Sequence, residues 1–261
     1  MPETMARVAL ISHTAQPERL VAAAARMCYS AAEAETILEG LSEEKAAGLL
    51  EMLGEIGHES PVEHASFTFA IRGVSRSLLA QITRHRIASF SVQSQRYVRE
   101  REFEYVMPPE IAGDPEAAAL FRQAMEQDQQ TYDRLTEILT AKRQAALEAE
   151  GTPPEEARKA ARKGAIEDAR FVLPNACATQ MMVTMNARSL RNFFRLRCCN
   201  RAQWEIRQVA RQMLLQCRQA APHLFAKAGP ACLSGPCPEG RMSCGRADQV
   251  RALYRAESWE S

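Results

Sequence analysis

The segment RHRIASFSVQSQRYV, residues 84–98, concentrates side chains that could bind a ligand. It combines Arg84, His85, Arg86 and Arg96 with serine and glutamine side chains, and it contains no Asp or Glu. Forked guanidinium donors, together with hydroxyl and amide groups, suit phosphate oxygens and the edges of pyrimidines. The composition of this segment therefore predicts a site for a phosphorylated ligand.

A second cationic segment, NARSLRNFFRLRCCNRAQWEIR, spans residues 186–207. Arg197 follows Phe193 and Phe194 by four and three residues, which on a helix places its guanidinium next to apolar side chains. A charge there is costly unless it is paired, and Glu205 is the nearest acid in this part of the sequence. Arg170, just before an apolar FVLP run, raises the same question. Each arginine alone is better explained as a helix-terminal or surface charge, but the whole set favours a bound anion.

The whole-chain composition excludes several classes of protein. The 261 residues fit one large domain or two small ones, and 46% of them are hydrophobic, which is enough for a globular core. A formal net charge of +1 argues against a general binder of nucleic acid polymers. The sequence shows neither a signal peptide nor an apolar run long enough to cross a membrane. We expect a cytoplasmic protein.

Hydrophobic periodicity and capping residues predict the elements that must position these side chains. Ser42, Asp114 and Thr152 are expected to cap helices. Gln81, Arg84 and His85 are expected to share one helical face. Strands are predicted at 7–12, 64–73, 101–109 and 181–185, and helices at 16–30, 43–57, 74–86, from 114 onward, within 151–173, at 186–199 and at 201–220.

These elements favour one mixed α/β (α+β) domain, with a small, largely antiparallel sheet flanked by long helices. The strands do not alternate regularly with helices, as a doubly wound sheet would require. No glycine-rich phosphate loop is present, so side chains must hold any nucleotide phosphate. Residues 1–220 are expected to form the domain, and residues 221–261 a loop-rich, cysteine-containing tail of the same domain.

The first segment resembles the signature of the flavin-dependent thymidylate synthases. That signature is RHR, seven residues, then Ser, continuing to Arg and usually Tyr, and here it reads Arg84-His85-Arg86, seven residues, then Ser94-Gln95-Arg96-Tyr97. Residues 58–69, 186–197 and 202–207 are similar to other segments of the same family. The resemblance extends from about residue 7 to residue 220.

The resemblance implies a FAD-dependent methyltransferase that makes dTMP from deoxyuridine monophosphate (dUMP). The family takes a one-carbon unit from 5,10-methylenetetrahydrofolate, obtains a hydride from reduced FAD and uses NADPH to reduce the flavin again. It also implies a homotetramer with active sites at the subunit contacts, so that several chains supply the arginines.

The resemblance also implies roles for individual residues. Arg197 would be catalytic, stabilising negative charge on the uracil ring. The implied dUMP-binding residues are Gln81, Arg84, Ser94, Gln95, Arg96, Arg170 and Arg197. The implied FAD-binding residues are Ser60, Arg84, His85, Arg86, Asn186, Arg188 and Asn192, with His58, Glu63 and Val92 at neighbouring positions. Two positions depart from the family pattern: Ser91-Val92 replaces a frequent Asn-Glu, and Arg201 stands where some members have His.

Eight cysteines remain to be explained. Cys232, Cys237 and Cys244 fall in the turn-rich tail, and Cys198 and Cys199 could lie near them. The spacing matches no CxxC pattern, so we expect ordinary reduced thiols and no metal, with zinc as the alternative.

Two other functions are weighed against the flavoenzyme. Cys237 could be the nucleophile of a thymidylate synthase that needs no flavin, although only Arg241 lies close to it in the sequence. The arginines could instead serve a non-enzymatic RNA-binding module, although aromatic residues for base stacking make up only 6% of the chain.

Overall fold

The computed structural model describes residues 1–95 and 103–256, and the chain in it forms two compact units. The first unit contains Met1–Met5, Arg72–Ala80 and the described part of Val92–Met181. The second contains Ala6–Ile71, Gln81–Ser91 and the described residues from Met182 onward.

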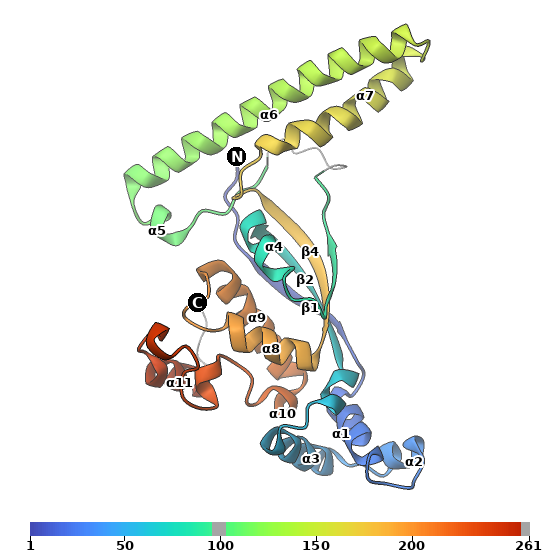
Figure 1. Ribbon diagram of the computed structural model, residues 1–261, viewed down its shortest axis with the longest axis vertical. Helices are drawn as coiled ribbons and strands as arrows, with labels where there is room; N and C mark the ends of the chain where they lie inside the picture. The colour runs from blue at the N-terminus through green and yellow to red at the C-terminus, as the bar shows by residue number, and fades with distance from the viewer. Residues whose placement is uncertain (96–102, 257–261) are drawn as a thin grey trace. The chain divides into compact units, whose positions relative to one another are not determined.

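Four strands form one sheet in the order β1-β2-β4-β3 (Figure 1). They are β1 (Arg7–His13), β2 (Ser66–Ser75), β3 (Ser89–Val92) and β4 (Ala178–Asn186). The Ala187 N–H donates to the Ala65 carbonyl at 2.8 Å, and the Arg76 N–H donates to the Cys177 carbonyl at 3.1 Å. The start of β2 therefore pairs with the end of β4 and the end of β2 with the start of β4, which makes the pair antiparallel. The expected small antiparallel sheet is confirmed.

The first unit is built on a long helical hairpin of α6 (Pro115–Ala149) and α7 (Pro154–Ala169), which lie side by side (Figure 1). The expected cap of α6 is present, because Asp114 Oδ1 accepts from the Ala117 N–H at 2.9 Å. Buried alanines recur every four residues along α7, and their small side chains let the two helices approach closely. These alanines are Ala157, Ala161, Ala165 and Ala169. The remaining elements of this unit are α5 (Pro109–Ala112), the 3-10 turn η2 (Arg170–Val172) and most of α4 (Arg76–Ile82).

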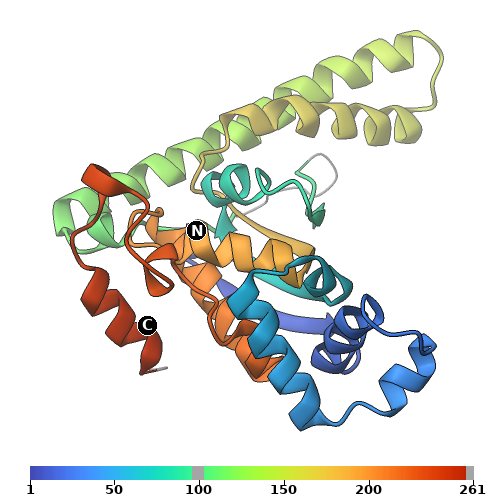
Figure 2. The same cartoon turned by 60° about the horizontal axis from the view of Figure 1, so that its bottom comes forward.

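The second unit packs helices around an aromatic core. Its helices are α1 (Pro17–Met27), α2 (Ala34–Glu39), α3 (Glu43–Ile56), α8 (Ala187–Arg197), α9 (Trp204–Ala220), α10 (Pro222–Phe225) and α11 (Ala247–Arg255), with the 3-10 turns η1 (Ser60–His64), η3 (Ala231–Leu233) and η4 (Gly240–Met242). Figure 2 shows α1, α2 and α3 gathered together. Phe225 packs edge-on against Phe67 and Phe194, with ring centroids 5.2 and 6.0 Å apart. This contact joins the sheet to α8.

No helix within residues 1–95 and 103–256 has the length and apolar character of a membrane span.

Three local expectations are wrong. The helix that follows β2 ends at Ile82, so Arg84 lies in the next turn and His85 beyond it. Residues 103–108 form no strand, because Tyr105 makes only isolated bridges to Glu3 and Cys177, and prolines follow at once. Residues 101 and 102 of that predicted strand lie outside the described residues.

Thr152 does not cap α7. Pro153 occupies the cap position and makes no side-chain capping bond, while the Thr152 N–H closes the preceding turn by donating to the Leu147 carbonyl at 3.0 Å. The tail also holds more regular structure than expected, since α11 was not predicted. Outside the tail, β3 was not predicted either.

Gly73 in β2 provides a test of backbone strain. Its φ is +67°, and a Cβ at this position would lie 2.4 Å from the Met5 carbonyl oxygen. We expect Gly73→Ala to lower the free energy of unfolding by about 2 kcal/mol or more. The matched control is Gly48→Ala inside α3, where a Cβ meets nothing within 4 Å; it should raise stability by up to about 1 kcal/mol. Chemical denaturation measures both, and an unchanged or higher stability for Gly73→Ala would contradict the strain.

Candidate functional site

Arg197 closes α8 and is held by two uncharged groups. The apolar side of α8 is anchored by Phe193 and Phe194, both 0% exposed. Arg197 Nε donates to His85 Nε2 at 3.1 Å, and its Nη2 lies 3.5 Å from the Gln81 carbonyl oxygen. In the described part of the chain no carboxylate pairs with Arg197, Glu205 included. As far as the described residues go, the guanidinium is therefore positioned without being neutralised.

His85 is the side chain that orients Arg197. Its ring packs edge-on against Phe193, with centroids 4.9 Å apart. Burial, and then the charge of Arg197, lower the pKa of His85 to about 4, so the imidazole is neutral at pH 7. Because Nε2 accepts from Arg197, the remaining ring proton sits on Nδ1. The family resemblance implied that His85 binds FAD. In the structure, His85 also forms a hydrogen bond with Arg197, the arginine that is expected to be catalytic.

A second cation stands beside this pair. Burial, and then the charge of Arg84, lower the pKa of Arg197. Arg84 and Arg86 are both exposed on the loop between α4 and β3, next to Ile87, which is 73% exposed. The RHR residues therefore present a concentrated positive charge around an arginine that has no acidic partner among residues 1–95 and 103–256, an arrangement that attracts an anion.

Apart from the RHR residues, the residues expected to bind FAD come from the end of β4, from α8, from η1 and from the turn before η1. Asn186 Oδ1 accepts from the Ser189 N–H at 2.8 Å and caps α8. Arg188 donates to Glu63, and to Glu59 at 3.3 Å, and the hydrogen bond to Glu63 is the main cause that raises the pKa of Arg188. The structure thus brings Glu63 and Arg188 together.

His58 and Ser60 are also brought together. His58 Nε2 and the Ser60 hydroxyl lie 3.1 Å apart. Asn192, one helical turn beyond Arg188, accepts from Arg195 at 3.2 Å.

Several of these side chains line a cavity of about 1030 Å³ within the second unit. Its polar lining includes Glu59, Arg188, Arg191, Asn192, Arg195 and Arg218. A cavity of this size with many cationic groups suits a large ligand that carries a diphosphate. The sequence analysis did not identify four of these lining residues, namely Glu59, Arg191, Arg195 and Arg218. The spacing of Arg188, Asn192 and Arg195 along one helical face was the available signal.

The remaining expected dUMP residues lie in the first unit. Gln95 is 8% exposed, and its Nε2 donates to Cys177 Sγ at 3.3 Å, so this side chain is engaged inside the protein. Arg170 Nε donates to the Glu167 carbonyl at 3.0 Å, and its guanidinium lies 5.8 Å from the centre of the Phe171 ring. Ser94 and Val92 are half-buried just before Gln95, whereas Arg96 lies outside the described residues.

The neutral state of His85 predicts a dependence on pH. The folded pKa is below the ordinary value of 6.5, so the unfolded chain binds the extra proton first as the pH falls. The stability that His85 contributes is complete above pH 6.5 and is lost as the pH falls towards 4. We expect the excess stability of the wild type over His85→Gln, which does not titrate, to shrink across that window. NMR should place the His85 midpoint near 4; a midpoint near 6.5 would contradict this environment.

Comparison with known proteins identifies the family. The family model described as "Thymidylate synthase complementing protein" matches residues 9–223. A flavin-dependent thymidylate synthase of Clostridium tetani is 52% identical over 248 residues, which cover 95% of this chain and 96% of that protein. The enzyme of the same name from Nitratidesulfovibrio vulgaris is 49% identical, with 94% and 97% covered.

The fold has a solved counterpart. A crystal structure of a UMP/dUMP methylase, PolB from Streptomyces cacaoi bound with 5-Br dUMP, covers 86% of this chain and 94% of its own, with a TM-score of 0.65 and 24% identity. That likeness concerns the fold alone, whereas the sequence matches extend over nearly the whole chain and confirm the resemblance read from the RHR signature. This chain belongs to the flavin-dependent thymidylate synthase family.

Proposed function

We propose that this chain converts dUMP into dTMP in the cytosol and that Arg197 is its catalytic residue. Members of the family are FAD-dependent methyltransferases of dTMP synthesis. The observation that carries the residue assignment is the Arg197 guanidinium, held by a neutral imidazole and a carbonyl and paired with no carboxylate in the described chain. Such a group binds an anionic ring more strongly than a neutral one.

Arg197 acts by electrostatic stabilisation. Its two hydrogen bonds fix the plane of the guanidinium before the substrate arrives, so little reorganisation is needed when charge develops. An arginine stays protonated while a negative charge grows beside it, which a lysine or a histidine does less reliably. His85 is the positioning residue, because its acceptor nitrogen directs the Nε–H of Arg197 and leaves terminal N–H groups available for the uracil oxygens.

The phosphate of dUMP is assigned to Arg84, Ser94, Arg96 and Arg170, with Gln81 and the Gln95 backbone as further polar contacts. Support comes from the exposed Arg84 guanidinium and from the absence of a glycine-rich phosphate loop in the sequence. Arginine forks are suited to this task, since they meet phosphate oxygens bidentately.

FAD fits the donors that the second unit offers. The cavity lined by Arg188 and Asn192 is large and cationic, and Ser60, Glu63 and Asn186 lie on the elements around it. Arg86 and His85 would reach the flavin from the RHR loop. When bound, reduced FAD supplies the hydride, while 5,10-methylenetetrahydrofolate supplies the carbon and NADPH renews the reduced flavin. The protein's own part is to hold these molecules and to exclude water.

Family membership decides against the two other functions. An RNA-binding module needs no flavin, and a cysteine-nucleophile synthase needs neither FAD nor the RHR signature. Cys237 lies in a loop between η3 and η4, while Arg197 is at the end of α8. Mass spectrometry should therefore find no nucleotide adduct on Cys237 during turnover.

We also propose that the active enzyme is a homotetramer whose sites combine residues of different chains. Arg84, Arg86 and Ile87 are exposed together on one loop, and an exposed isoleucine beside functional cations suits a subunit contact. A second chain that packs on this loop would enclose the anion site and strengthen its electrostatics.

The activity is tested by anaerobic incubation with dUMP, 5,10-methylenetetrahydrofolate, FAD and NADPH. We expect dTMP to form only when all four are present, and the bound flavin to bleach with NADPH. A colourless protein that binds RNA but yields no dTMP would overturn the proposal.

Arg197→Lys separates catalysis from cofactor binding. We expect kcat to fall about 100-fold or more, because one oriented donor pair is lost from the transition state, while the Kd for FAD changes by less than about threefold. Arg134→Lys on α6, whose side chain is 72% exposed, is the matched control and should behave as wild type. Equal losses in kcat and in FAD affinity would show that Arg197 is structural.

Complementation tests the shared sites. Arg197→Lys and Arg170→Ala, at two arginines assigned to dUMP, should each be nearly inactive as pure proteins. If their residues meet across a subunit contact, mixed tetramers will contain some sites with both native arginines and will recover about a quarter of the activity for random assembly. Recovery indistinguishable from zero, in assemblies shown to be mixed, would place both residues in the same chain's site.

A further inference from the structure

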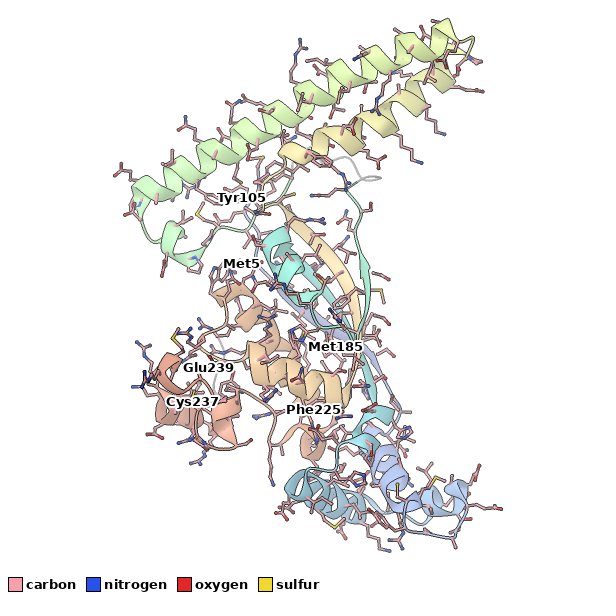
Figure 3. The ribbon with its side chains drawn as sticks, viewed as in Figure 1. Met5, Tyr105, Met185, Phe225, Cys237 and Glu239 are labelled. Carbon is pink, nitrogen blue, oxygen red and sulfur yellow. The ribbon has the colours of Figure 1, made fainter. Side chains whose placement is uncertain are left out.

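The C-terminal tail forms part of the wall of the large cavity in the second unit. The family model ends at residue 223, whereas the lining of the cavity also includes residues of the segments 224–234 and 251–255. Figure 3 shows Phe225 near the start of the tail and Cys237 and Glu239 farther along it. The other lining residues come mainly from α3 and α8. The cavity therefore combines the matched region of the family with a segment that follows it.

Hydrogen bonds from two long helices hold the start of the tail in place. Arg191 on α8 donates to the Leu224 carbonyl at 2.6 Å. Arg218 on α9 donates to the Ala228 carbonyl at 2.9 Å. Because Lys227 lies between these two anchored carbonyls, its backbone has a fixed position along the cavity wall.

Helix α11 is held at the same wall. Tyr254 is 3% exposed, its hydroxyl donates to the Cys198 carbonyl at 3.2 Å, and Arg218 donates to the Tyr254 carbonyl at 3.3 Å. Gly229 allows the tail to pack closely here, since its φ is +150° and an added Cβ would lie 3.2 Å from Tyr254 Cδ1. Arg255, the last residue of α11, therefore lines the cavity from an anchored helix.

Cationic side chains outnumber acidic ones around the cavity. The lining contains six arginines and one lysine, against the two acids Glu51 and Glu59. A concave surface with one predominant sign of charge focuses the electrostatic potential and raises the local concentration of oppositely charged ligands. The cavity is therefore suited to an anion.

Most of these arginines already form bonds that stabilise the fold. Arg191, Arg218 and Arg251 donate to main-chain carbonyls. Arg188 donates to the Glu59 carboxylate at 3.3 Å. The donors that remain for a ligand must come largely from other residues of the lining.

Two cations of the tail have no such bonds. Within residues 1–95 and 103–256, no hydrogen bond or ion pair engages the side chain of Lys227 or of Arg255, and both residues are exposed. Arg195 on α8 also lines the cavity, and it donates to the uncharged Asn192 amide oxygen at 3.2 Å. Ammonium and guanidinium groups in this situation have donors available for phosphate oxygens.

We propose that Lys227 and Arg255 bind the diphosphate of FAD, an assignment that rests on the proposed function and on FAD occupying this cavity. A diphosphate carries anionic oxygens on both phosphates, which suits one ammonium and one guanidinium supplied by different segments. Because the diphosphate takes no part in the hydride transfer, these two residues determine the affinity for the cofactor and not the chemistry. The C-terminal tail is thus part of the cofactor site.

Lys227→Gln and Arg255→Gln test the proposal in the full-length protein after bound flavin is removed. Each variant should raise the Kd for FAD about fivefold, and the double variant about 30-fold, because charge-assisted hydrogen bonds are lost. Quenching of flavin fluorescence measures the Kd, and the loss should be largest at low salt. Arg246→Gln, at an exposed arginine of the same tail that does not line the cavity, is the matched control and should keep the wild-type Kd.

Conservative variants separate ligand binding from support of the fold. Lys227→Arg and Arg255→Lys keep the positive charge and should bind FAD within about threefold of the wild type. The Tm of every variant without flavin should equal that of the wild type. Equal losses of FAD affinity in the conservative and the Gln variants would show a structural role and would overturn the proposal.

The remaining outcomes distinguish this proposal from the proposed function. If the wild type binds FAD and forms dTMP while the double variant keeps the wild-type Kd, the tail assignment is wrong and the proposed function stands. A wild type that binds no FAD would overturn both. NADPH also carries a diphosphate, so its Kd is measured in parallel; a change for NADPH with none for FAD would overturn the assignment to FAD.

Discussion

The site depends on a half-buried guanidinium that is oriented by hydrogen bonds and that, in the part of the chain that the structure describes, is paired with no carboxylate. Removing a charge from water without a counter-charge is costly, and most proteins offset that cost with a carboxylate. Here Arg197 donates to an imidazole nitrogen and lies near a backbone carbonyl, and both of these groups are dipoles rather than charges. Much of the positive potential is therefore left for a ligand. Burial, and then the charge of the guanidinium, lower the pKa of His85, so Arg197 helps to keep the imidazole neutral.

A run of aromatic contacts fixes this pair relative to the sheet. Phe67 on β2 packs on Phe225, Phe225 on Phe194, Phe194 on Phe193, and the Phe193 ring meets His85, with centroid distances from 4.9 to 6.0 Å. Edge-to-face contacts of large, fully buried rings leave little rotational freedom. The position of Arg197 is thus determined by the hydrophobic core rather than by surface ion pairs, which contribute little and are screened by salt.

The arginines of the second unit serve three different purposes. Arg197 keeps its charge available, whereas Arg188 is bound to the carboxylates of Glu59 and Glu63. Arg191 and Arg218 donate to main-chain carbonyls of Leu224 and of Ala228, and so fasten the tail to the helices. Helix ends and turns leave carbonyls without partners, and a forked donor can satisfy two of them at once. The cationic character of the second unit therefore reflects structural bonds as well as ligand binding.

The sequence by itself determined the local features. Periodicity located β1, β2, β4 and the long helices, Asp114 and Ser42 were correct caps, and the RHR signature identified the family. These features depend on neighbours within a few residues along the chain. Only the tertiary structure decided that α4 stops before Arg84 and that His85 accepts from Arg197 across 112 positions. The physical reason is that hydrogen bonds and burial between distant segments arise from packing, and packing leaves no periodic trace in the sequence.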